Sequence, residues 1–200
     1  MNAQVDEAKN NSPTEHRVSA RLSGYNGRVS FRIRKVASGD FEKLWRIDQI
    51  CFDPQLAYSR PELAFYMRRP SAFTLVAESN ADERSAADGN PPLTPPAILG
   101  FIVAEKAQRS GHIITIDVIP KARRLGVGSL LLAAAEDRLL ESGALAVELE
   151  TAVNNEPAIR FYKQKGYFVE RTVRGYYSNH LDALLMAKPL PVKMNSSHGT

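Results

Sequence analysis

A strand, a turn with two glycines and a helix follow one another without a break between residues 111 and 142. Residues 111–119, GHIITIDVI, are typical of a strand that is interrupted at Pro120. The helix after the turn carries apolar residues on one face, namely Val127, Leu130, Leu131 and Ala134. Gly143 is the residue at which this helix is expected to end. Such a unit favours a fold in which helices pack on a sheet.

The rest of the chain continues this mixture of strands and helices. The expected strands are residues 29–36, 72–78, 97–106, 111–119, 144–151, 167–173 and 181–190. The expected helices are residues 38–52, 60–69, 127–142 and 156–166. This order favours a single mixed α/β domain that contains both hairpins and helical crossovers.

The domain is expected to span residues 29–190 of the 200. Residues 1–28 are polar and low in large apolar side chains, which predicts a disordered tail. Residues 79–96 are rich in Gly, Pro, Ser and charged residues. This composition predicts a flexible loop between two strands, either a tolerated insertion or a segment with a function. Residues 191–200 are expected to fray.

Composition limits the classes of function. The net charge of +4 is a smaller excess than a dedicated duplex binder carries, so no nucleic-acid partner is expected. Cys51 is the only cysteine, so no intramolecular disulfide can form, and packing is favoured over a nucleophilic role. There is no run of 18 apolar residues and no apolar signal segment, which predicts a cytoplasmic protein without a membrane span. The four histidines and the cysteine lack ligand spacing, so no metal is expected.

The turn between the strand and the helix has the chemistry of an anion site. The first N–H groups of a helix have no partner inside the helix, and the helix dipole makes that end positive. Gly126 and Gly128 leave the backbone uncovered, and Arg123 and Arg124 add positive charge. Neither GxGxxG nor GxxxxGK[ST] is present, so the turn alone is also compatible with a plain strand-to-helix connection.

Taken in chain order, several motifs resemble those of the GNAT acetyltransferases. The RxxGxG pattern of Arg123, Gly126 and Gly128 resembles their pyrophosphate loop for acetyl-CoA. The block VELETAVNNEPAIRFYKQKGYF, residues 147–168, resembles the block that follows this loop. YYSNHLDALLM, residues 176–186, is similar to the closing hairpin of the RimI type of protein N-terminal acetyltransferase and its archaeal relatives. The resemblance implies a mixed, mostly antiparallel sheet of six to seven strands with about four helices.

The resemblance also implies a co-substrate and the residues that hold it. Acetyl-CoA is the implied co-substrate. The residues implied to bind it are Ile116, Asp117, Val118, Arg123, Arg124, Leu125, Gly126, Val127, Gly128, Ser129, Asn155 and Tyr162. Backbone groups of residues 116–118 are expected to pair with the pantetheine arm, as an open strand edge can.

Acid–base chemistry is implied at three positions. Glu150 is the first candidate for the base that takes a proton from the acceptor amine, and His112 is the second. Tyr162 is implied to protonate the departing sulfur, although packing in the core is the alternative for it and for its neighbour Phe161. Tyr176 and Tyr177 are expected to border the entry of the peptide.

The implied activity is transfer of acetyl to the N-terminal α-amine of a protein or peptide, by direct attack in a ternary complex. A ribosomal protein is one candidate acceptor, and a monomer or weak dimer is expected. An α-amine has a pKa of about 7.7–8.0 and a lysine about 10.4, so the α-amine is the more easily made neutral. Two alternatives stay open: the same transfer to lysine side chains or small amines, and a non-catalytic acyl-CoA sensor.

Overall fold

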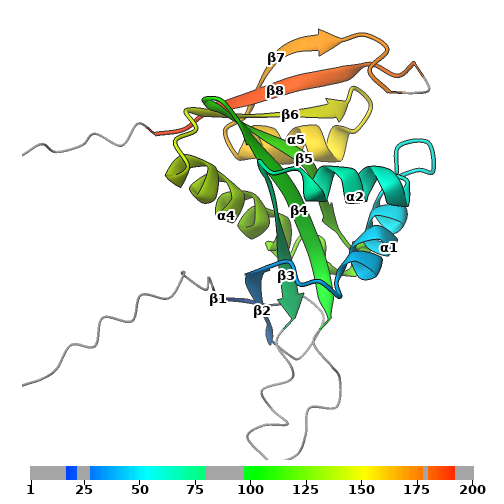
Figure 1. Ribbon diagram of the computed structural model, residues 1–200, viewed down its shortest axis with the longest axis vertical. Helices are drawn as coiled ribbons and strands as arrows, with labels where there is room; N and C mark the ends of the chain where they lie inside the picture. The colour runs from blue at the N-terminus through cyan, green and yellow to red at the C-terminus, as the bar shows by residue number, and fades with distance from the viewer. Residues whose placement is uncertain (1–16, 22–27, 80–96, 178–179, 192–200) are drawn as a thin grey trace, which may run out of the picture.

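The computed structural model describes residues 17–21, 28–79, 97–177 and 180–191 (Figure 1). The strands are β1 (Arg17–Arg21), β2 (Arg28–Lys35), β3 (Ala72–Ser79), β4 (Ile98–Ala107), β5 (Ser110–Val118), β6 (Ala146–Ala152), β7 (Phe168–Val173) and β8 (Ala183–Pro189). The α-helices are α1 (Phe41–Cys51), α2 (Arg60–Arg68), α4 (Val127–Glu141) and α5 (Glu156–Gln164), and a 3-10 helix, η1 (Pro120–Ala122), follows β5. Each expected strand and helix is present, with its ends shifted by a few residues.

The described strands join one sheet in the order β1-β2-β3-β4-β5-β6-β8-β7. β5 and β6 run parallel, and the other described neighbours run antiparallel. This confirms the predicted fold class, a mixed, mostly antiparallel sheet with four α-helices in the described part of the chain. The sheet has eight strands, one more than the upper end of the prediction.

The additional strand, β1, corrects the predicted domain boundary. Residues 1–28 are expected from their composition to form a disordered tail, yet Arg17–Arg21 pairs antiparallel with Arg28–Arg32. The bonds of a strand ladder join backbone groups, so an edge strand can be added without the large apolar side chains on which the prediction relied. The remaining tail and loop predictions concern residues 1–16, 22–27, 80–96 and 192–200, which lie outside the described residues.

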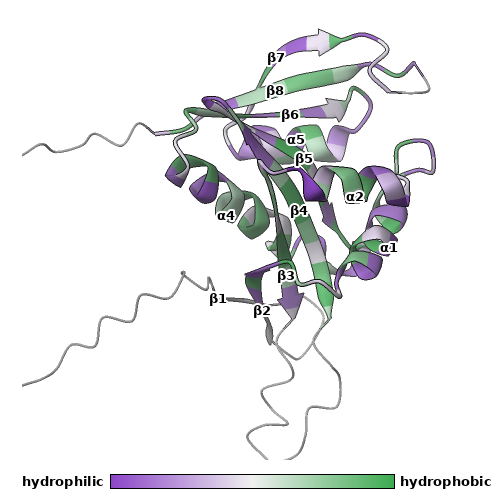
Figure 2. Ribbon diagram, in the orientation of Figure 1, coloured by the Kyte–Doolittle hydropathy of each residue, from purple (hydrophilic) through white to green (hydrophobic). Residues whose placement is uncertain are grey.

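Alternate residues of the central strands face two separate cores. On β4, Phe101 and Val103 pack in the core under α1 and α2, whereas Ile102 and Ala104 pack in the core under α4. β4 is therefore hydrophobic over most of its length (Figure 2). Tyr162 of α5 belongs to the second core, so α5 packs on the same side of the sheet as α4.

β5 and β6 pair over a short stretch and then separate. Ser110–Ile113 pairs with Ala146–Leu149, after which β5 continues beside β4 and β6 continues beside β8. A bulge at Ile114 marks the point of separation. Figure 1 shows the consequence, because β6, β8 and β7 run across the direction of β4. Beyond Ile113, β5 has an edge that β6 does not cover.

Gly100 of β4 is required by the close approach of β5. A Cβ atom at this position would overlap the carbonyl oxygen of Asp117 and lie 3.1 Å from the Cα of Val118, and neither backbone atom can turn away. We expect Gly100→Ala to lower the free energy of unfolding by about 1–3 kcal/mol, the usual cost of over-packing. Urea denaturation followed by circular dichroism measures this loss. Gly39→Ala is the matched control, because a Cβ there meets no atom within 4 Å. Equal midpoints for the two variants would contradict the prediction.

Candidate active site

Along the uncovered edge of β5, alternate backbone groups point away from β4. The hydroxyl of Tyr58 donates to the carbonyl of Ile114 at 3.4 Å, and Arg123 Nε donates to the carbonyl of Val118 at 3.0 Å. Peptide groups alternate in direction along a strand, so those of Ile116 point to the same side. Ile116 is therefore placed to pair with an extended ligand at this edge.

The glycine turn enters α4 with the geometry of an anion site. Gly126 is the N-cap of α4, and its φ of +85° is a conformation that favours glycine. The N–H of Leu130 donates to the carbonyl of Gly126 at 3.0 Å, so the N–H groups of the preceding turn have no partner inside the helix. Arg123 and Arg124 are exposed beside this turn. The structure thus brings the predicted residues Arg123–Ser129 together at the end of β5.

Gly128 is not required by the packing of the chain itself. A Cβ at this position would lie 3.6 Å from Phe161 Cζ and 3.6 Å from Val118 Cγ2, which are ordinary van der Waals distances. The chain therefore has room for an alanine here. The absence of a side chain leaves the first turn of α4 open to a ligand, as the predicted pyrophosphate site requires.

Glu150 and His112 form a close pair where β5 and β6 separate. His112 Nε2 lies 2.7 Å from Glu150 Oε2, and the hydroxyl of Tyr176 donates to the same carboxylate. Burial opposes ionisation of Glu150, yet the hydrogen bond and charge of His112 and the hydrogen bond of Tyr176 hold its pKa below the usual value. Burial also opposes the charge on His112, but Glu150, Glu105 and Glu148 raise its pKa above the usual value. Both predicted bases are thus stabilised in their charged forms.

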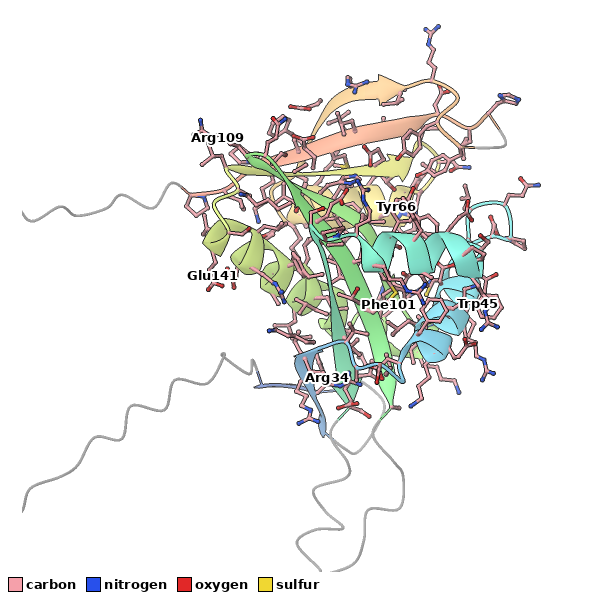
Figure 3. All side chains as sticks on the ribbon, in the orientation of Figure 1. Arg34, Trp45, Tyr66, Phe101, Arg109 and Glu141 are labelled. Carbon is pink, nitrogen blue, oxygen red and sulfur yellow. The ribbon has the colours of Figure 1, made fainter. Side chains whose placement is uncertain are left out.

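Two pairs of tyrosines lie beside this ion pair. The ring centroids of Tyr176 and Tyr177 are 5.0 Å apart, and those of Tyr58 and Tyr66 are 5.3 Å apart. Burial raises the pKa of Tyr58, and the proximity of Tyr66, Tyr176 and Tyr177 raises it further, which places the two pairs together. Figure 3 shows Tyr66 at the edge of α2 that faces β6. The sequence predicted Tyr176 and Tyr177 but not Tyr58, which lies in an irregular segment that no motif marks.

Tyr162 and Asn155 occupy α5 in different ways. Tyr162 is 7% exposed, whereas Phe161 is half-buried against the start of α4. Burial raises the pKa of the Tyr162 phenol, and nearby Asp117 and Tyr177 raise it further, so the phenol keeps its proton at neutral pH. Asn155 is the N-cap of α5, and its Oδ1 accepts from the N–H of Ala158 at 3.2 Å. Its amide oxygen therefore has a structural role in addition to the predicted contact with a ligand.

Two buried carboxyl groups lie behind the uncovered edge. Asp117 is 1% exposed and Asp48 of α1 is fully buried, and each has one carboxyl oxygen, Oδ1, without a hydrogen-bond partner. Burial raises the pKa of Asp48 to about 6, and burial together with the charge of Asp48 raises that of Asp117 well above its usual value. The role predicted for Asp117, pairing with the pantetheine arm, involves its backbone groups only. The sequence did not indicate that its side-chain carboxyl group is buried. Cys51 packs nearby and donates to the carbonyl of Val118 at 3.4 Å.

Within the described residues, no helix is long and apolar enough to cross a membrane. In the same part of the chain, no three His, Cys, Asp or Glu side chains gather in a way that would hold a metal ion.

Comparison with known proteins identifies similar sequences and folds. Residues 41–167 match the model of the acetyltransferase (GNAT) family. An N-alpha-acetyltransferase of Sulfurisphaera tokodaii is 42% identical over 83 residues, which is 41% of this chain and 50% of that protein. The chain thus spans about half the length of this curated relative.

Two further proteins match over most of their length. An uncharacterized N-acetyltransferase of Methanocaldococcus jannaschii is 31% identical over 80% of this chain and 92% of its own. The crystal structure of Ard1 from Thermoplasma volcanium has a TM-score of 0.65 and 28% identity, and the match covers 81% of this chain and 99% of that one.

The buried Asp48 predicts an unusual dependence of stability on pH. The pKa of Asp48 is about 6 in the folded chain, against 3.8 for an unperturbed aspartate such as that of the unfolded chain. The contribution of this group to the free energy of unfolding is therefore complete below about pH 4 and is lost as pH rises through 6. We expect Asp48→Asn to be more stable than the parent protein at pH 7.5. The difference in free energy of unfolding between the two proteins should be about 1 kcal/mol larger at pH 7.5 than at pH 5. Urea denaturation at the two pH values measures this difference. Asp137→Asn, at an exposed position of α4, is the control and should give no such change.

Proposed function

The chain belongs to the acetyltransferase (GNAT) family, and we propose that it transfers the acetyl group of acetyl-CoA to the N-terminal α-amine of a protein or peptide. The observation that carries this proposal is the His112–Glu150–Tyr176 cluster at the point where β5 and β6 separate. The cluster puts an ionised carboxylate between the uncovered edge of β5 and two tyrosines, the exposed Tyr176 and the half-buried Tyr177. The relatives named N-alpha-acetyltransferase add support for an α-amine as the acceptor.

Acetyl-CoA supplies the acetyl group as a thioester, and the described residues fit its shape and charge. The uncovered N–H groups at the start of α4, with Arg123 and Arg124 beside them, would hold the pyrophosphate. The outward peptide groups of Ile116 would hold the extended arm. These two features adjoin in the chain, since α4 follows directly on β5 and η1. A diphosphate joined to a strand-like amide chain is the ligand that matches both.

Glu150 is the residue that we assign as base. An α-amine has a pKa of about 7.7–8.0, so much of it is an ammonium ion at neutral pH and must lose a proton before it can attack. The pKa of Glu150 is held below its usual value by His112, so the carboxylate is ionised and accepts hydrogen bonds throughout the neutral range. Glu150 can therefore hold the ammonium and take its proton, directly or through a water molecule.

Tyr162 is the residue that we assign as acid. Its phenol retains a proton at neutral pH, because burial and the proximity of Asp117 raise its pKa. A thiol has a pKa of about 8.5, below that of the buried phenol, so Tyr162 would donate a hydrogen bond to the departing thiolate and pass its proton to the sulfur only as solvent or the acidic groups around it replace that proton. The core position of Tyr162 is compatible with this role, since one buried ring can pack and donate.

Acetyl transfer to short peptides tests the proposal. The protein is mixed with acetyl-CoA and peptides that differ at their first residues, each with an internal lysine and one copied from a ribosomal-protein N-terminus. Fragment mass spectrometry locates the added acetyl group. We expect acetyl on the α-amine, with kcat/KM lowered about 100-fold or more in Glu150→Gln and in Tyr162→Phe, the usual scale for lost acid–base catalysis.

Other outcomes of this experiment distinguish the two alternative functions. Acetyl on the internal lysine would replace the proposal with lysine acetylation. Binding of acetyl-CoA without transfer to any peptide, polyamine or amino acid would replace it with an acyl-CoA sensor. A substitution that acts by unfolding the protein is recognised from a changed circular dichroism spectrum.

Binding of CoA tests the anion site separately from the chemistry. We expect Arg124→Gln to weaken CoA binding about tenfold or more, because a charge-assisted hydrogen bond to a phosphate contributes about 1.5–3 kcal/mol. Isothermal titration calorimetry measures the change. Arg109→Gln is the matched control, because Arg109 lies beside Leu145, beyond the opposite end of α4 (Figure 3). Equal losses in the two variants would indicate general charge attraction and contradict the assigned site.

A further inference from the structure

A third carboxylate, Glu105, lies on the other side of His112. Glu105 of β4 and His112 of β5 are direct partners in the antiparallel register, so their side chains project from the same face of the sheet. His112 Nδ1 lies 3.9 Å from Glu105 Oε1, while Nε2 lies 2.7 Å from Glu150 Oε2. Each ring nitrogen of His112 therefore faces a carboxylate from a different strand.

Glu105 is held in place by the end of α2. Its side chain is 8% exposed, and its Oε1 lies 2.9 Å from Arg69 Nη1. The hydroxyl of Ser71 donates to the other carboxyl oxygen at 3.2 Å. A buried carboxylate is costly unless it is paired, and Arg69 provides that pairing from a half-exposed position at the C-cap of α2. The contacts of Arg69 and Ser71 fix where the negative charge sits relative to the imidazole ring.

The charged groups around His112 lie on β6, on β4 and at the end of α2. They are Glu150 and Glu148, Glu105, and Arg69, respectively. Glu148 is turned toward Ser110, whose hydroxyl donates to it at 2.7 Å. Glu105 is thus the carboxylate that faces Nδ1, the ring nitrogen that Glu150 does not use.

We propose that Glu105 is a positioning residue for His112: its carboxylate, anchored by Arg69 and Ser71, orients the ring with Nε2 toward Glu150 and favours the ring that carries protons on both nitrogens. An imidazolium between two carboxylates cannot accept a further proton. His112 is then the cationic partner that keeps Glu150 ionised, and Glu150 is the base. This assignment of roles rests on the proposed acetyl transfer, whereas the effect of Glu105 on the ring does not.

Titration of the ring tests the inference without any substrate. The full-length protein is labelled with ¹⁵N-histidine, the signal of His112 is assigned with His112→Gln, and its pKa is read from two-dimensional NMR spectra. We expect Glu105→Gln to lower the pKa of His112 by about one unit, because an opposite charge at this distance shifts a pKa by about 1–3 units and Arg69 offsets part of it. Glu141→Gln, at an exposed site at the far end of α4 (Figure 3), should change it by less than about 0.2 unit.

Arg69→Gln distinguishes an electrostatic effect from simple damage to the structure. Arg69→Gln removes a positive charge near the imidazole ring and leaves the Glu105 carboxylate without its cationic partner. The pKa of His112 is therefore expected to rise. Disruption of the packing would instead move both variants in the same direction, toward the value of about 6.5 for a free histidine. Equal pKa values in the parent protein and Glu105→Gln, or shifts of the same sign in Glu105→Gln and Arg69→Gln, would overturn the proposal.

The pH profile of kcat/KM tests the assignment of roles. In His112→Gln, Glu150 loses its charged partner and needs a higher pH to ionise, so we expect the acidic limb of the profile to move to higher pH by about half a unit to one unit. An unchanged limb together with the expected NMR shift would overturn the role of His112 as the partner of Glu150. A protein that shows the NMR shifts but acetylates no amine would refute the proposed function and leave the effect of Glu105 standing.

Discussion

The separation of β5 from β6 is the constraint on which the site depends. Within a regular sheet, both edges of a central strand are used by its neighbours, and no backbone group is left for a ligand. Here the parallel pairing covers Ser110–Ile113 of β5 and ends there, so the rest of that strand pairs with β4 alone. The exposed peptide groups of β5 are compensated locally, because Tyr58 and Arg123 supply hydrogen bonds to Ile114 and Val118. Ile116 lies between these two and remains for an incoming chain.

Electrostatics divides the site into two parts of opposite sign. The start of α4 combines the positive end of a helix with exposed arginines, and it suits an anion. At the separation point of the strands, Glu150, Glu105 and Glu148 surround a single histidine, and this end suits the cationic form of an amine. The two parts lie at opposite ends of the uncovered edge of β5. A ligand with an anionic end and an acceptor with a cationic end would therefore meet along this strand in one orientation only.

Local patterns in the sequence predicted the elements well and their contacts less well. The strands and helices follow from apolar periodicity and from the glycines and prolines at their ends, and the motifs located Glu150, Tyr162 and the glycine turn. β1 was not predicted, because its pairing with β2 uses backbone groups that leave no trace in composition. Glu105 and Asp48 are long-range contributions, since Glu105 meets His112 through strand register and Asp48 meets Asp117 through the packing of α1 on β5. Neither relation is encoded in a short motif.

The bulge at Ile114 explains how one strand serves both the acid–base cluster and the core. In a regular strand, His112 and Asp117 would point to opposite faces, because they are five residues apart. The extra residue shifts the alternation, so both side chains lie on the face of α1 and α2, where Glu105 and Asp48 meet them. The same shift returns Ile116 and Val118 to the core under α4, so the segment that offers its backbone to a ligand is anchored by its side chains. Removing the bulge would restore regular pairing and turn either the histidine or the buried acid to the wrong face, which is why the polar site and the irregular backbone occur at the same place.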